Sequence, residues 1–226
     1  MDDIVFGSTI DHLAHEFSEE MKREFEMSMV GELNYFLGLQ VKQREDGIII
    51  SQEKYAKNLV KRFGLDSKKP TSTLMSSLTK LSRDAAGVEV DPTLYQSMIS
   101  SLLYLTASKL DIAFSVGVCA RFQAVPKESH LTAVKRIICY INCTSDYGIW
   151  YSRDSNKCLA GYFDADWAGC IDDRKSTSGG CFYLGNNLVS WIRKKQNSVS
   201  LYTAEAEYIA TASCYAQLLW MKKLST

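Results

Sequence analysis

The sequence predicts an α+β fold, in which helices and strands occupy separate stretches of the chain. Three observations predict it. Apolar residues recur at helical spacing near the N-terminus and in the middle of the chain, other stretches alternate as strands do, and a long helical pattern comes last. With 226 residues, 46% of them hydrophobic, the chain has enough apolar material for a folded core.

The N-terminal part is expected to hold a helix followed by a β-hairpin. Residues 12–27 carry a large apolar side chain at every fourth position, as on one face of a helix. These side chains are Leu13, Phe17, Met21 and Phe25. Apolar residues then alternate over 37–41, as a half-buried strand requires, and an isoleucine run over 48–50 gives the second strand. Asp46 and Gly47 predict the positive-φ pair of a tight turn between these strands.

Helical periodicity dominates the next part of the chain. Residues 52–63 predict one helix, and three more are expected over 94–107, 110–122 and 129–142. Residues 67–92 are rich in Ser and Thr and have no periodicity, which predicts a linker or a long ordered loop.

The C-terminal part is expected to contain four short strands and a long helix. The strands are predicted at 148–151, 159–167, 181–184 and 188–192. A turn at 185–187 would join the last two, and the helix would run from about Thr203 to Leu224. Its expected apolar stripe consists of Ala206, Ile209, Ala210, Ser213 and Trp220.

Charge and cysteine usage favour an intracellular protein. Lys and Arg total 26 and Asp and Glu total 26, so the net charge does not itself indicate nucleic-acid binding. No apolar run approaches the roughly 20 residues of a membrane span, and no signal peptide is visible, so we expect no membrane contact. The seven cysteines form no CxxC pair, which indicates reduced thiols. The cytoplasm or nucleus is the expected compartment, with an organelle as the alternative.

Two carboxylates in the strand predicted at 159–167 suggest a cation site. Asp164 and Asp166 fall on the same face of this strand, about 7 Å apart by the strand rise. Like charges at that separation gain from a shared divalent cation, and carboxylate oxygens suit Mg²⁺ or Mn²⁺. The alternative is a solvated strand face.

The start of the last helix carries two further acids. Glu205 and Glu207 follow Thr203, a plausible N-cap, and acids in this position also stabilise the helix dipole. At about 100° per residue, the two glutamates lie about 200° apart, so only one of them can face a site packed on the helix. Two aspartates from the strand and one glutamate from the helix could therefore form a carboxylate cluster of the kind that holds metals at phosphodiesters.

Basic residues lie in the sequence between these acids. They are Arg174, Lys175, Arg193, Lys194 and Lys195. With Trp191 and Tyr202 nearby, they suggest a surface that follows a phosphate backbone. The alternative is an ordinary solvated charged face.

Longer stretches around these residues carry a family resemblance. They are FDADWAG at 163–169, DRKSTSG at 173–179, VSW at 189–191, KKQ at 194–196 and TAEAEY at 203–208. Together they resemble the ribonuclease H domain of copia-type retrotransposon polyproteins. Upstream, NYFLG at 34–38, GIIISQ at 47–52 and KYA at 54–56 resemble the end of the family's reverse transcriptase palm and the start of its thumb.

The resemblance implies three units. Residues 1–66 would form the C-terminal part of the palm and the start of the thumb. Residues 67–145 would form a linker and a helical connection segment. Residues 146–226 would form a truncated ribonuclease H-like domain, a mixed sheet with a helix.

The resemblance also implies the site residues. Asp2 and Asp3 occupy the positions of the polymerase metal-binding aspartates. Asp164 matches the first nuclease aspartate, and Glu207 is the preferred match for the helix glutamate, with Glu205 as the alternative register. Mg²⁺ or Mn²⁺ would be the cofactor, an RNA–DNA hybrid, RNA or DNA the ligand, and the remainder of the Pol polyprotein the partner.

The expected function is that of a fragment of a retrotransposon polymerase and ribonuclease H. The family's first polymerase aspartate and its later nuclease aspartate have no counterpart in the chain, so we expect the isolated chain to be inactive. The alternative is a non-catalytic remnant with residual nucleic-acid binding or no activity.

Overall fold

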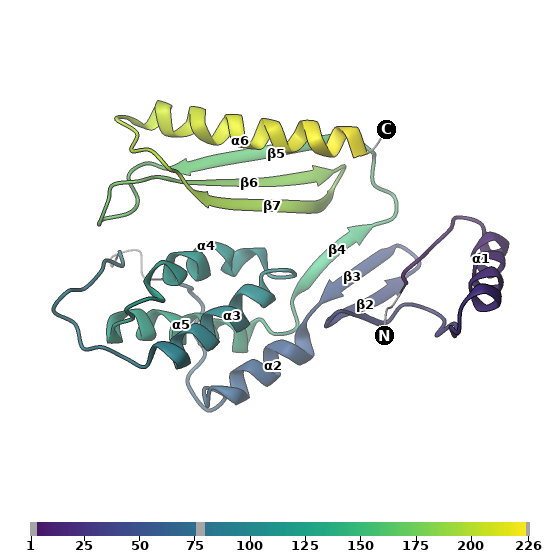
Figure 1. Cartoon of the computed structure of the whole chain (residues 1–226), viewed down its shortest axis with the longest axis horizontal. Helices are drawn as coiled ribbons and strands as arrows, with labels where there is room; N and C mark the ends of the chain where they lie inside the picture. The colour runs from purple at the N-terminus through teal and green to yellow at the C-terminus, as the bar shows by residue number, and fades with distance from the viewer. Residues whose placement is uncertain (1–3, 76–79, 225–226) are drawn as a thin grey trace.

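The computed structural model describes residues 4–75 and 80–224. These residues form two antiparallel sheets and a group of packed helices, which confirms the predicted α+β class (Figure 1). In chain order the helices are α1 (Asp11–Glu24), α2 (Glu53–Arg62), α3 (Pro92–Leu105), α4 (Leu110–Cys119), the 3₁₀ turn η1 (Ala120–Phe122), α5 (Glu128–Cys143) and α6 (Thr203–Leu224).

The first sheet joins segments that are far apart in the sequence. Its strands are β1 (Tyr35–Phe36), β2 (Leu39–Arg44), β3 (Gly47–Ser51) and β4 (Gly148–Ser152), in that order across the sheet. The predicted order of strands along the C-terminal part is confirmed, but β4 pairs with β3 and not with the strands that follow it. The second sheet therefore has three strands.

The β2–β3 hairpin was expected to turn at Asp46 and Gly47 with both residues at positive φ, and this is wrong. Arg44 pairs with Gly47, so the two loop residues are Glu45 and Asp46, and neither Asp46 nor Gly47 has a positive φ. A Cβ at Gly47 would overlap the Trp150 ring on β4. The glycine is thus required by the neighbouring strand and not by the turn.

The hydrophobic core lies among α2, α3, α4 and α5. Its fully buried side chains include Ala56, Tyr95, Leu102, Leu105, Ile112, Val116, Val134, Ile137, Ile138 and Ile141. Tyr95 also donates a hydrogen bond from its hydroxyl to the Cys119 carbonyl, at 2.8 Å, which ties α3 to the end of α4. The three helices predicted over 94–142 are confirmed, and residues 67–91 contain no helix or strand among those described.

The second sheet lies between α6 and the helical core. Its strands are β5 (Leu159–Asp166), β6 (Thr177–Leu184) and β7 (Asn187–Lys195), with β5 and β7 at its two edges. Helix α6 packs along one face, and β7 contacts α4 on the other side (Figure 1). A Cβ at Gly161 of β5 would approach the Leu218 side chain, so glycine there allows the close packing of α6.

The predicted apolar stripe of α6 is only partly correct. Ala206 and Ala210 are buried, but Ser213 and Trp220 are exposed and Cys214 is buried in their place. Residues 206, 210 and 214 share one helix face at a spacing of four. Trp220 is 56% exposed, because at about 100° per residue position 220 lies about 120° around the helix from Cys214, the last buried residue of this face.

Candidate functional site

Asp164 lies on an edge strand of the second sheet and is exposed. Side chains alternate along β5, so Asp164 projects from the face opposite to the one that Gly161 presents to α6. We call this opposite face, which is uncovered at Asp164 but meets the helical core at Asp166 and Arg193, the open face. The carboxylate is therefore accessible from solvent at the edge of the sheet.

Glu207 reaches the same edge from α6. Its Oε1 accepts a hydrogen bond from the backbone N–H of Ala165, at 3.2 Å. Ala165 directly follows Asp164, and its N–H is available because β5 is an edge strand of the described sheet. The helix thus delivers one glutamate to the residue next to the exposed aspartate.

Glu205 has a different role. Its Oε2 accepts a hydrogen bond from the backbone N–H of Leu201, at 2.7 Å. This bond satisfies a donor just before the first turn of α6, as a capping side chain does. Of the two glutamates left open by the sequence, Glu207 bonds to the backbone of Ala165, the neighbour of Asp164, and Glu205 bonds to the backbone just before α6.

Asp166 is set apart from Asp164 by its surroundings. Its Oδ1 accepts a hydrogen bond from the backbone N–H of Thr177. Burial raises the pKa of Asp166, and the bond from Thr177 and the nearby cations Arg121 and Arg193 oppose this rise. Asp166 is therefore part of the contact between the sheet and the helical core, although it shares a strand face with Asp164.

The donor set at this edge suits a hard divalent cation. Asp164 and Glu207 supply carboxylate oxygens, and Mg²⁺ is commonly held by one or two carboxylates together with water and substrate phosphate. Within residues 4–75 and 80–224, no three His, Cys, Asp or Glu side chains gather closely enough to hold a metal by themselves. Asp2 and Asp3, the predicted polymerase ligands, lie outside the described residues.

The five predicted basic residues do not form one surface. Arg174 and Lys194 are exposed, and Lys175 is half-buried. Lys195 forms an ion pair with Asp173 at 2.7 Å, and Arg193 lies over the Phe114 ring of α4. Two of the five thus serve contacts within the chain.

Sequence reasoning missed one cation at this junction. Arg121, in η1, donates a hydrogen bond from Nη2 to Oγ1 of Thr177 on β6, at 2.8 Å. The two residues are far apart in the sequence, and Arg121 lies outside the motifs that carry the resemblance, whereas Thr177 belongs to the stretch at 173–179. Only the packing of the sheet on the helical core brings them together.

Comparison with known proteins shows the family of the chain. Residues 1–77 match the family model described as reverse transcriptase (RNA-dependent DNA polymerase). The chain is 35% identical over its whole length to the retrovirus-related Pol polyprotein from transposon RE1 of Arabidopsis thaliana, and covers 15% of that protein. It is 32% identical to the corresponding polyprotein from transposon TNT 1-94 of Nicotiana tabacum, with 99% of this chain and 17% of the relative covered.

A relative of similar length also exists. The uncharacterized mitochondrial protein AtMg00810 of Arabidopsis thaliana is 32% identical over 97% of this chain and 91% of its own length. No solved structure matches the chain. In residues 4–75 and 80–224, no helix combines the length and apolar character needed to cross a membrane. Because the similarity to transposon polyproteins runs through the whole sequence, the chain belongs to the family of copia-type retrotransposon Pol polyproteins, of which it represents a segment with part of the reverse transcriptase.

Proposed function

We propose that Asp164 and Glu207 are metal ligands of a ribonuclease H-type site that acts on the RNA strand of an RNA–DNA hybrid. In the same proposal, residues 1–66 form the end of a polymerase palm and the start of its thumb, 67–145 connect it to the nuclease, and 146–226 are ribonuclease H-like. Asp2 and Asp3 would belong to the polymerase metal site. The whole polyprotein would copy RNA into DNA.

The observation that carries this proposal is the hydrogen bond from Ala165 N–H to Glu207. It fixes the glutamate at the edge of β5, next to the exposed Asp164, while leaving its second carboxylate oxygen to act as a ligand. Oxygen ligands of this kind favour Mg²⁺ or Mn²⁺ over zinc. A bound ion of this class would activate water and stabilise a leaving oxygen at a phosphodiester.

The protein's own contribution is position and charge. Asp164 is exposed, so a phosphodiester can approach it without a change in the sheet. Glu207 is held by its hydrogen bond to the Ala165 backbone. Its side chain therefore loses little further rotamer freedom when it binds a cation. Exposed Arg174 and Lys194 would add attraction for a phosphate backbone.

Metal binding tests the proposal directly. We expect Asp164→Asn and Glu207→Gln each to weaken Mn²⁺ binding at least about tenfold, measured by the loss of the free-ion signal in electron paramagnetic resonance. Glu205→Gln is the matched control and should leave Mn²⁺ binding unchanged, because Glu205 bonds to Leu201. Equal Mn²⁺ affinity in Asp164→Asn and the unsubstituted chain would refute the assignment.

Hybrid cleavage tests the expected lack of turnover. The proposed site has two carboxylates, and a pre-organised metal charge is the main source of rate in such reactions. We therefore expect the chain alone to leave an RNA–DNA hybrid intact in Mg²⁺ or Mn²⁺. Cleavage that disappears in Asp164→Asn would contradict this expectation and show that the site turns over.

A further inference from the structure

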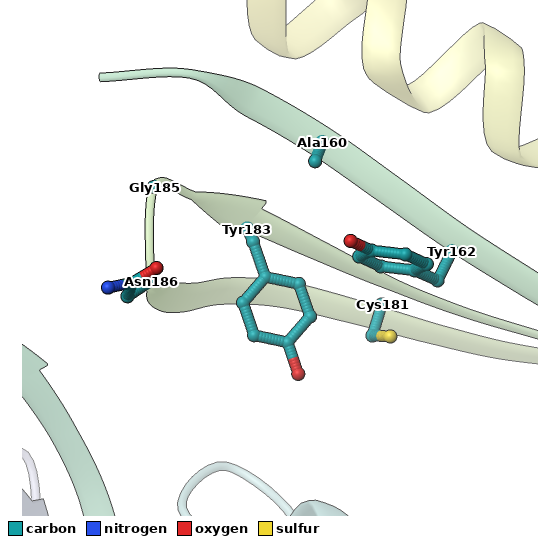
Figure 2. A pocket seen from close by; sticks show the side chains of 6 residues that line it. All are labelled: Ala160, Tyr162, Cys181, Tyr183, Gly185 and Asn186. Atoms are coloured by element: carbon teal, nitrogen blue, oxygen red, sulfur yellow. The ribbon is translucent and has the colours of Figure 1, made fainter. Parts of the chain in front are cut away.

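The open face of the second sheet carries a pocket at the end where β5 begins and the β6–β7 hairpin turns. It has a volume of about 460 Å³ and is lined by Ala160, Tyr162, Cys181, Tyr183, Gly185 and Asn186. The hollow is wide open to solvent, so it suits a group that lies against a surface rather than one that is enclosed. Figure 2 shows Tyr162 turned toward Tyr183, with Asn186 at the hairpin end.

Two tyrosine rings form the walls of this pocket. Their centroids lie 5.9 Å apart and their planes meet at 83°, an edge-to-face contact. Tyr162 nevertheless remains 63% exposed. An edge contact leaves ring surface uncovered, so the pair offers an aromatic surface to a ligand as well as a cross-strand contact.

The lining defines the chemical class of that ligand. None of the six lining residues is charged, so the pocket does not suit a phosphate or a carboxylate. It offers aromatic rings, two phenol hydroxyls and one amide, a set that complements a flat, neutral group with hydrogen-bonding edges. Nucleobases are such groups, and they stack on aromatic side chains irrespective of sequence.

The pocket continues directly to Asp164. Tyr162 and Asp164 are two residues apart on one strand, about 7 Å by the strand rise, and share the open face. Their partners on β6 are Cys181 and Gly179. Both are small, so no bulky side chain from β6 rises between Tyr162 and Asp164. A nucleic-acid strand could thus lie across this face with a base at Tyr162 and a phosphate near Asp164.

We propose that Tyr162 and Tyr183 form a stacking subsite for a nucleobase of a single-stranded nucleic-acid segment, adjacent to the Asp164–Glu207 edge. This subsite rests on the proposed function, because a single-stranded segment that runs out of the hybrid at the Asp164–Glu207 edge would reach it. Its binding is separate from metal binding, since its lining includes neither Asp164 nor Glu207.

Oligonucleotide binding in EDTA tests the subsite without the metal. We expect Tyr162→Ala to weaken binding of a short fluorescein-labelled oligodeoxythymidylate about 5- to 10-fold, measured by fluorescence anisotropy. Tyr162→Phe keeps the ring and should stay within about twofold. Tyr208→Ala is the matched control, because Tyr208 is 76% exposed on α6, away from the pocket. Thermal melting of each variant confirms that it is folded.

An abasic oligonucleotide of the same length separates stacking from backbone attraction. It should bind more weakly to the unsubstituted chain and be insensitive to Tyr162→Ala. Equal binding of abasic and base-containing probes, or no effect of Tyr162→Ala, would overturn the subsite. An absence of oligonucleotide binding together with a Tyr162-dependent sedimentation coefficient would also overturn it, and would assign the face to a protein contact.

The two proposals fail in distinguishable ways. Asp164→Asn should lose Mn²⁺ affinity and still bind the oligonucleotide in EDTA as the unsubstituted chain does. Unchanged Mn²⁺ binding in that variant, with Tyr162-dependent oligonucleotide binding, would refute the metal site and leave the subsite standing. The reverse pattern would refute the subsite alone.

Discussion

Asp164, Asp166 and Asp173 lie close together in the sequence, yet each carboxylate has a different environment. Asp164 faces solvent, and Asp166 is drawn toward the backbone of Thr177. Asp173 pairs with Lys195, whose Nζ lies 2.7 Å from its Oδ2. The residue type therefore indicated the available chemistry. The local partners decide which carboxylate is free to bind a cation.

The Asp173–Lys195 pair predicts a specific pH dependence of stability. The hydrogen bond from Lys195 holds the pKa of Asp173 well below its ordinary value. A carboxyl group whose pKa is lowered by folding stabilises the protein above its ordinary pKa of about 4, and this contribution is lost as the pH falls below it. We expect the melting temperature of Asp173→Asn to lie below that of the unsubstituted chain at neutral pH, by no more than about 3 °C.

That difference should shrink as the pH is lowered through about 4 toward 2. Lys195→Met removes the other partner and should show the same pattern. A difference in melting temperature that stays constant from neutral pH to acid would mean that the ion pair does not stabilise the fold.

At the scale of single elements, α1 shows that periodicity predicts a helix more reliably than it predicts burial. The predicted stripe is present, but Leu13 is 44% exposed and Phe17 is 38% exposed. The Phe6 ring packs on the Phe17 ring at a tilt of 56°, with centroids 4.9 Å apart, so the preceding segment covers part of this stripe. Helix α1 thus presents an apolar face that the rest of the described chain leaves largely uncovered.

This face predicts self-association of the chain. Exposed apolar patches of this kind commonly mark association sites. We expect the double variant Leu13→Gln, Phe17→Gln to sediment more nearly as a monomer than the unsubstituted chain at the same concentration. Glu16→Gln and Glu20→Gln, on exposed positions of the same helix, are the control pair and should not change the sedimentation. A monomeric unsubstituted chain at all concentrations would contradict the prediction.

At the scale of the whole molecule, the second sheet is joined to the helical core through Arg193. Its guanidinium carbon lies 4.9 Å from the centroid of the Phe114 ring, and burial lowers the pKa of Arg193 to about 10. Its Nε is buried without a hydrogen-bond partner among the described residues. A Cβ at Gly117 of α4 would overlap Nη1, so this glycine makes room for the guanidinium.

A double-mutant cycle tests this contact. Gly117→Ala should stabilise an Arg193→Ala background by about 0.5–1 kcal/mol, because alanine favours the helix. With Arg193 present, the added methyl group displaces the guanidinium, so the gain should be lost or reversed. Urea unfolding should then give a coupling of at least about 1 kcal/mol.

Gly7→Ala is the control for that cycle, since nothing lies within 4 Å of a Cβ built there. It should have the same effect in both backgrounds. Additive effects of Gly117→Ala and Arg193→Ala would show that the guanidinium does not depend on the space at Gly117.

The sequence by itself determined the α+β class, most helices and strands, and the family. These features depend on local residue spacing and on long ordered motifs, and both are present in the sequence whatever the tertiary packing is. The same motifs pointed to Asp164 and to a glutamate at the start of α6.

Only the tertiary structure decided which elements meet. Strand β4 joins β3 across the chain, Trp220 faces solvent, and Arg193 packs on Phe114 of α4 instead of joining a basic surface. It also separated Glu207, which bonds to Ala165, from Glu205, which caps its own helix. The physical reason is that such contacts depend on side-chain volume and on unpaired backbone groups at a sheet edge, and neither is fixed until distant segments pack together.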